Sequence, residues 1–183
     1  MAAWRLAHGF SLPELLVSLA VLGLLLAGIF GLLRGGMGAY AVGSARVEGQ
    51  QAARVALERM VKELREAGYD PTGAGIPAIV TAAPDRVIFQ RDLNKNGVVD
   101  ATSERVTFLV RAGDSVLRRD AGAGAQPIVE GVRRLTLTYF DRAGVVTTDP
   151  ARVASIRISL DVGLAGPRSV METQVSLRNY RDR

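Results

Sequence analysis

The sequence predicts an α+β protein in which a long N-terminal helix, partly transmembrane, packs on an antiparallel β-sheet domain. Residues 10–33 are predominantly apolar and contain one charged side chain, Glu14, and about 20 apolar residues suffice to span a bilayer core. Residues 44–67 continue as an amphipathic helix, and after Pro77 the apolar period changes from 3.6 to 2, which is typical of strands. The predicted organisation is a leader at 1–9, a helix at 10–67 and a sheet domain at 68–183.

A carboxylate stands near the start of the apolar run. Placing a charge at the centre of a membrane span costs about 2.5–3.5 kcal/mol, so Glu14 is a functional candidate that needs a cationic partner. Residues 10–33 contain no cation. The alternative is an ordinary secretory signal or signal anchor. A secretory signal has a shorter apolar region and a small-residue cleavage site after it, and a plain anchor does not need Glu14.

The residues around Glu14 form a recognisable motif. The run Gly-Phe-Ser-Leu-Pro-Glu-Leu-Leu-Val follows a short basic leader and resembles the cleavage and methylation motif of type IV prepilins. The resemblance implies that prepilin peptidase cuts between Gly9 and Phe10, that Phe10 is then N-methylated, and that Glu14 pairs with the N-terminal amine of a neighbouring subunit. It also implies a type IV pilin-like fold, with prepilin peptidase, other pilin or pseudopilin subunits and the inner membrane as partners.

The orientation in the membrane follows from charge and from this resemblance. Arg5 and the chain's own amine precede the span, and positive charge stays on the cytoplasmic side. Arg34, just beyond the span, favours the opposite orientation. With the resemblance added, we expect a single-pass inner-membrane protein with a cytoplasmic N-terminus and an extracytoplasmic C-terminal domain, located in a filament when assembled.

Small residues recur at four-residue steps along the span. This spacing lets the backbone of another helix approach closely, although glycine and alanine are also common in membrane helices. Each glycine weakens a helix by about 1 kcal/mol relative to alanine, so residues 34–38 are the predicted place for bending or melting. Our hypothesis is that these residues pack the filament core and soften the helix; the predicted packing residues are Gly23, Ala27, Gly31 and Gly35, and the spacing continues through Ala39 and Gly43.

The second half of the helix carries an apolar stripe, and Gly68 and Pro71 are its stop signals. The strands beyond it are separated by short turns and not by helices, which indicates an antiparallel sheet with one solvated face. The helix is the only long element available to cover the other face. The stripe residues are Ala53, Leu57, Met60, Val61, Leu64 and Ala67, and the predicted strands are 86–91, 105–111, 115–119, 135–139, 156–162 and 175–177.

Two further segments extend the resemblance. Ile128–Val132, followed by a strand ending at Tyr139, resembles the central segment of PilW-type and J-type minor pilins, and Val175–Asn179 resembles their closing strand. This implies a minor pilin or pseudopilin that primes or caps a type IV pilus or type II secretion pseudopilus. Major pilins are often shorter and commonly carry a C-terminal disulfide, whereas this chain has no cysteine.

Composition argues against catalysis. The only histidine, His8, lies in the leader, and there is no cysteine, so the processed chain lacks most nucleophile–base pairs and most zinc sites. We therefore expect no enzymatic activity, no small-molecule substrate and no required cofactor. A membrane-anchored enzyme using Asp92 and Asp100 remains a weaker alternative, because nothing places a nucleophile or cofactor beside them.

The net charge of +5 is spread among interspersed acids and bases, which is typical of a solvated surface and does not favour nucleic-acid binding. The alternative function is a DNA-uptake or adhesion pilin that acts as a binding module. The arginines that would serve it are Arg118, Arg119, Arg133, Arg134, Arg178, Arg181 and Arg183.

One loop carries oxygen side chains at alternate positions, followed by glycine. This matches the front of a calcium loop, D-x-[DN]-x-[DN]-G, but the twelfth position is Ser103 and Glu104 lies one residue late. The flanking elements are predicted strands and not helices, and Asx turns close such a loop without an ion. The candidate Ca²⁺ ligands are Asp92, Asn94, Asn96, the backbone carbonyl of Val98, and Asp100, with Glu104 as a further possibility.

Overall fold

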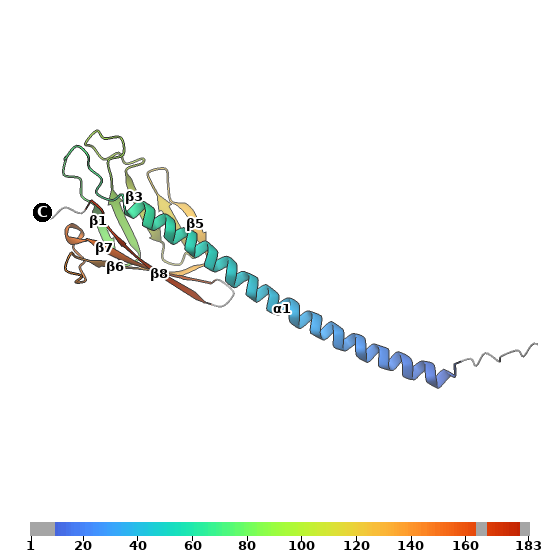
Figure 1. Cartoon of the computed structure of the whole chain (residues 1–183). Coiled ribbons are helices and arrows are strands. Elements are labelled where there is room, and N and C mark those ends of the chain that lie inside the picture. Colours follow the sequence, from blue (N-terminus) through green and yellow to red (C-terminus); the bar gives the residue numbers. More distant parts are fainter. Residues whose placement is uncertain (1–9, 164–167, 180–183) are drawn as a thin grey trace, which may run out of the picture. The chain divides into compact units, whose positions relative to one another are not determined.

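The computed structural model describes residues 10–163 and 168–179. Its first element is a single α-helix, α1, at Leu12–Leu64 (Figure 1). The chain divides into two compact units, with the boundary between Gly43 and Ser44. The predicted leader, including Gly9, lies outside the described residues.

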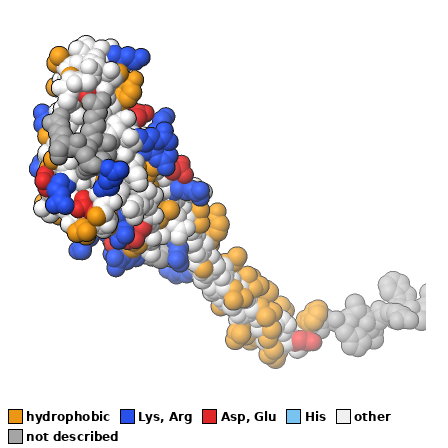
Figure 2. Space-filling view, turned by 60° about the vertical axis from the view of Figure 1, so that its left-hand side comes forward, with side chains coloured by type: hydrophobic (Ala, Val, Ile, Leu, Met, Phe, Trp, Pro, Cys, Tyr) orange, Lys and Arg blue, Asp and Glu red, His pale blue; other side chains and the backbone are white. Residues whose placement is uncertain are grey.

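The first unit is the apolar part of α1. It is long and apolar enough to cross a membrane, and none of its apolar window is buried. Figure 2 shows hydrophobic side chains gathered on the surface of this part of the helix. The helix is continuous through residues 34–38, where the glycines predicted bending or melting. The structure therefore shows no break there, and softening within a filament stays a hypothesis.

In the second unit, α1 places its predicted apolar stripe in the core. Ala53, Leu57, Met60 and Leu64 are buried together with Ala56. The last turn leads to Gly68, whose φ of +74° lies in the left-handed region that favours glycine. A Cβ there would come within 2.8 Å of the Ala78 side chain. The predicted stop signal is therefore confirmed, although α1 itself ends at Leu64, before the predicted residue 67.

Among the described residues, eight strands follow in two antiparallel sheets, so the prediction of a single sheet was wrong. The five-stranded sheet has the order β1-β2-β3-β4-β5 and the three-stranded sheet has the order β6-β7-β8. All strand pairs are antiparallel, as predicted. The strands are β1 Ile79–Ala83, β2 Arg86–Gln90, β3 Arg105–Val110, β4 Val116–Asp120, β5 Gln126–Glu130, β6 Val132–Phe140, β7 Ser155–Val162 and β8 Ser169–Ser176.

The chain passes from one sheet to the other at Gly131, between β5 and β6. Backbone and side-chain bonds join the sheets: the Val132 N–H donates to the Ser115 carbonyl at 2.9 Å, and the Tyr139 hydroxyl donates to the Ala83 carbonyl at 2.8 Å. Burial, together with the nearby charge of Asp85, raises the pKa of Tyr139, so this hydroxyl keeps its proton. Tyr139 therefore acts as a fixed link between the two sheets.

The core lies between α1 and both sheets. The Phe89 and Phe108 rings stack there with centroids 6.0 Å apart, and the buried alternate residues of β6 and β7 add Leu137, Ile156 and Ile158. In Figure 1, the C-terminal part of α1 lies against the strands. This α+β arrangement, a long N-terminal helix with antiparallel sheets, is like that of type IV pilins and confirms the predicted fold class.

Candidate functional site

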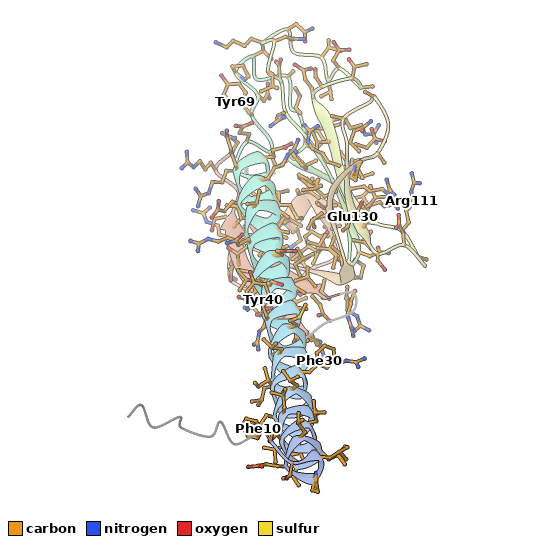
Figure 3. The ribbon with its side chains drawn as sticks, turned by 90° about the vertical axis from the view of Figure 1, so that its right-hand side faces the viewer. Phe10, Phe30, Tyr40, Tyr69, Arg111 and Glu130 are labelled. Atoms are coloured by element: carbon orange, nitrogen blue, oxygen red, sulfur yellow. The ribbon has the colours of Figure 1, made fainter. Side chains whose placement is uncertain are left out.

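The motif residues stand at the first turn of α1. The Leu15 N–H donates to the Ser11 carbonyl at 3.2 Å, and Pro13 fits this turn because the first helical N–H groups have no intrahelical acceptor. Glu14 is the acidic residue of the first turn, where the helix dipole favours a negative charge. Phe10 is 75 % exposed and lies at the beginning of the helix in Figure 3.

Glu14 is an exposed carboxylate among exposed apolar side chains. Its backbone carbonyl accepts a hydrogen bond from the Ser18 hydroxyl at 2.8 Å, but no described residue forms an ion pair with its carboxylate. Within a bilayer an unpaired carboxylate is costly. The geometry therefore leaves Glu14 available for a cation that comes from outside the described chain.

The predicted packing glycines lie on an open helix surface. A Cβ placed on Gly23, Gly31 or Gly35 would meet no atom within 4 Å. A neighbouring hollow of about 730 Å³ surrounds Gly36 and has apolar walls that include Leu33 and Tyr40. This surface can therefore accept another helix, and its role in filament packing stays a prediction.

The predicted calcium loop is closed by Asp92, which is fully buried. Its Oδ1 accepts the Lys95 N–H at 2.6 Å and the Asn96 N–H at 3.2 Å, and its Oδ2 accepts the Gly97 N–H at 2.9 Å. Lys95 and Gly97 adopt φ values of +64° and +77°. Asp92 thus folds the loop back on itself through backbone hydrogen bonds.

The other predicted ligands are exposed on this loop. The Asn94 side-chain oxygen accepts the Asn96 N–H at 3.0 Å, and the Asn96 oxygen accepts the Val98 N–H at 2.8 Å. These are successive Asx turns, which close without an ion. The described residues contain no group of three or more His, Cys, Asp or Glu side chains that could hold a metal. A calcium ion at this loop would depend on amide, carbonyl and carboxylate oxygens that also serve the loop.

Glu104 organises the same loop from inside. It is fully buried, and it accepts backbone N–H groups from Asp100 at 2.8 Å, Asn94 at 2.9 Å and Leu93 at 2.8 Å. These hydrogen bonds, led by those from Asp100 and Asn94, lower the pKa of Glu104 against the opposing effect of burial. Sequence reasoning considered Glu104 only as a late ligand and missed this structural role.

A charged network joins the loop region to α1. Arg91 is buried and pairs with Glu66, and its second terminal nitrogen lies 3.8 Å from Glu63. Glu63 also pairs with Arg119 of β4 at 2.8 Å and with Arg59 at 3.2 Å. The contacts fix the end of β2 and strand β4 to the same helical turn. Sequence reasoning missed this network because its members are far apart in the chain.

A second buried carboxylate, Asp70, closes the loop after α1. Its oxygens accept the backbone N–H groups of Ala74 at 3.0 Å and Gly75 at 2.9 Å, together with the Thr72 hydroxyl at 3.1 Å. Burial alone acts to raise the pKa of Asp70, but these hydrogen bonds outweigh it and lower the pKa to about 2. The charged form is therefore part of the native loop.

This shift predicts a pH-dependent effect of Asp70→Asn. Because the folded-state pKa lies below the ordinary value, the wild-type carboxylate stabilises the fold fully above about pH 5, and the contribution is lost as the pH falls through about 2. We expect the variant to be less stable than wild type at pH 7, with the difference in melting temperature disappearing towards pH 2. Thermal unfolding of both full-length proteins in detergent from pH 7 to pH 2 measures this difference in melting temperature. Glu48→Gln, an exposed control on α1, should show no such trend, and a constant difference at all pH values would contradict the account.

Comparison with known protein families identifies a sequence motif that includes the first turn of α1. Residues 4–30 match the prokaryotic N-terminal methylation motif, which is characteristic of type IV prepilin-like proteins. No curated protein matches the chain. The motif implies processing by prepilin peptidase and assembly with other pilins, and it favours a structural role over catalysis. With the long apolar helix, it is consistent with a membrane-anchored, type IV pilin-like protein.

Proposed function

We propose that this chain is a minor pilin or pseudopilin, a structural subunit that primes or caps assembly of a type IV pilus or type II secretion pseudopilus. The observation that carries the proposal is the unpaired Glu14 carboxylate in the first turn of an exposed apolar helix, four residues after Phe10. After cleavage at Gly9, each subunit presents a new amine and a carboxylate close together. A neighbour's amine then supplies the cation that Glu14 lacks, so the pair forms only between subunits in register.

The sheet domain supports the minor class. Because the chain has no cysteine, no disulfide stabilises this domain. The segment that resembles minor pilins forms β5, the crossing at Gly131 and β6, and Tyr139 links the two sheets there. In this proposal the N-terminus is cytoplasmic and the sheet domain is extracytoplasmic while the helix is anchored in the membrane. After assembly, the sheet domain lies at a filament end.

The distribution of the chain between membrane and filament tests this proposal. Quantitative mass spectrometry of sheared filaments should find this chain at a small fraction of the main subunit's abundance. A strain that lacks it should assemble far fewer filaments, with recovery on re-expression. An abundance equal to that of the main subunit would make it a major pilin, and recovery from membranes alone with normal filament numbers would contradict an assembly role.

The alternative function is a DNA-uptake or adhesion pilin that uses exposed arginines. The structure weakens two of its candidates, because Arg118 pairs with Asp114 at 3.0 Å and Arg119 pairs with Glu63. Arg133, Arg134 and Arg178 are exposed, whereas Arg181 and Arg183 lie outside the described residues. Steeply salt-dependent binding of duplex DNA would support this alternative, and absence of binding at low salt would count against it.

We also propose that the polar loop binds Ca²⁺ weakly, through Asp92, Asn94, Asn96, Val98 and Asp100. The support is the donor set: hard cations prefer oxygen ligands, and the carbonyl and carboxylate oxygens here retain lone pairs beyond their present hydrogen bonds. The ordered Asx turns also mean that little loop entropy remains to be lost on binding. The affinity expected for such extracellular modules is about 10⁻⁴–10⁻³ M.

Calcium at ten times its dissociation constant should stabilise the chain by about 1.4 kcal/mol. The expected result is a rise in melting temperature with 5 mM CaCl₂ and a measurable heat in isothermal titration. The effect should be absent with MgCl₂, which demands a more rigid octahedral site, and lost in Asp100→Asn. No heat and no shift with millimolar calcium would exclude the site.

A further inference from the structure

The four sheet edges differ in how they are protected against pairing with another strand. Strand β1 carries an irregular register between Ile79 and Thr81. Strand β5 contains Pro127 and pairs with β4 through another irregularity. Strand β6 is also irregular and lies beside β1, β3 and β4 of the other sheet. Bulges, prolines and covering elements are the devices by which natural proteins protect sheet edges.

Strand β8 has neither an irregular register nor a proline, and α1 reaches it at its first residue, where Gln50 Nε2 donates to the Ser169 hydroxyl at 3.0 Å. It is eight residues long and contains neither proline nor lysine. It pairs with β7 in an unbroken register from Ser155↔Ser176 to Val162↔Ser169. In the part of the chain that the structure describes, it is the last strand of its sheet and has no strand on its other side. A long, regular edge of this kind is a ready template for one more strand.

The backbone groups on this edge can be assigned from one hydrogen bond. The Leu177 N–H donates to the Ala154 carbonyl at 2.9 Å, so this residue points towards β7. Successive residues of an antiparallel strand alternate between bonding their partner and facing away. The residues whose N–H and C=O groups face the open edge are therefore Val170, Glu172, Gln174 and Ser176, and all four are exposed.

Charge indicates which strand fits this edge. Glu172 lies in the middle of β8 and forms no ion pair with any described residue, whereas the neighbouring carboxylate Asp161 pairs with Arg168 at 3.0 Å. An opposite charge directly across from Glu172 would stabilise an added strand, and a like charge would destabilise it. In the two hydrogen-bonded registers closest to full antiparallel overlap of two β8 strands, Glu172 lies either directly opposite its own copy or diagonally next to it. The edge therefore disfavours a second copy of this chain.

We propose that the open edge of β8 binds an extended segment of a different polypeptide, which adds a fourth strand beside β8 and places a lysine or arginine opposite Glu172. Main-chain hydrogen bonds to the outward groups of β8 supply the affinity, and the cation supplies the register. This inference goes beyond the proposed function and does not depend on it, because it rests only on the second unit.

The test uses full-length protein in detergent micelles and a labelled nine-residue peptide of alternating threonine and valine with lysine at its centre. Fluorescence anisotropy should show saturable binding. Gln174→Pro should abolish it, because proline removes an outward N–H and places its ring on the docking edge. The same change removes no backbone hydrogen bond to β7. It removes only the exposed side-chain bond from Gln174 Nε2 to the Ser155 hydroxyl at 3.2 Å, so the variant should melt close to wild type. If it does not fold, Ser176→Pro replaces it.

A charge exchange tests the register. Glu172→Lys should weaken binding of the lysine peptide by about twofold to fivefold and strengthen a matched peptide with central glutamate by a similar factor. The proposal would be overturned if the wild type did not bind the lysine peptide, or if Gln174→Pro bound it equally well. It would also be overturned if Glu172→Lys did not come to prefer the glutamate peptide over the lysine peptide. Because the chain has no cysteine, Gln174→Cys also tests self-pairing. A disulfide-linked dimer formed in membranes, but not by the exposed control Val145→Cys, would make the occupant a second copy and overturn the proposal.

Discussion

Replacing Glu14 with alanine should abolish stable incorporation of the chain into filaments while leaving its insertion into the membrane intact. The carboxylate has no ion pair within the described chain, and it stands in the first turn of α1, whose N-terminal part is apolar and exposed. Its removal eliminates an insertion cost of up to about 3 kcal/mol, so the variant should insert at least as well. In the proposed mechanism, the variant should lose the pair with a neighbour's amine, and with it the register between subunits.

Two variants separate charge from shape at this position. Glu14→Gln keeps the side-chain length and one carbonyl oxygen but removes the charge, and it should fail to assemble as Glu14→Ala does. Ser18→Ala removes only the hydroxyl that bonds the Glu14 carbonyl and should assemble normally. Immunoblots of sheared filaments and of membranes measure how much of each variant is in the filaments and how much is in the membrane. Filament levels of Glu14→Ala equal to wild type would remove the proposed role of this carboxylate.

Replacing Glu104 with alanine should cause a large loss of stability in the sheet domain. Its two oxygens accept the backbone N–H groups of Leu93, Asn94 and Asp100, and the side chain is fully buried. Each hydrogen bond to a charged acceptor contributes about 1.5–3 kcal/mol. Loss of three such bonds, whose donors belong to exposed residues that water can partly solvate, should lower the free energy of unfolding by about 3 kcal/mol.

Urea unfolding of the full chain in detergent, followed by circular dichroism, measures this loss. Glu104→Gln, which retains one acceptor oxygen, should lie between wild type and Glu104→Ala. The exposed Glu130 on β5 offers a matched control (Figure 3), and its alanine variant should change the stability by less than about 0.5 kcal/mol. A loss below about 1 kcal/mol in Glu104→Ala would show that the loop is held by other contacts.

Features with local signals were predictable from the sequence. The stripe at Ala53, Leu57 and Met60 predicted the buried face of α1, because the apolar residues that recur at helical spacing are the ones that the structure buries. Strands β2, β3 and β7 largely alternate between buried residues and residues that are partly or fully exposed, which is the pattern that a half-buried strand leaves in a sequence. The prepilin motif is also local, since its residues are consecutive in the sequence, from Gly9 to Val17.

Other features depend on contacts between distant segments and leave no local pattern. Strand β1 ends in Ala82 and Ala83, which give weak alternation, and Pro127 in β5 argues against a strand unless it lies at an edge. The division into two sheets depends on which strands pair, and alternation does not encode pairing. The Arg91–Glu66 pair joins residues 25 positions apart, so its members resemble ordinary surface charges in the sequence.

The most direct test of the account is the intact mass and N-terminal sequence of the chain isolated from native membranes. The account predicts a chain that begins with N-methylated Phe10, since residues 4–30 match the N-terminal methylation motif and Glu14 stands four residues beyond Phe10. A chain that retains Met1, or one cut beyond the apolar helix near Gly38, would contradict it. Glu14 would then have no methylated amine to pair with, and the protein would be a simple anchored or secreted sheet domain.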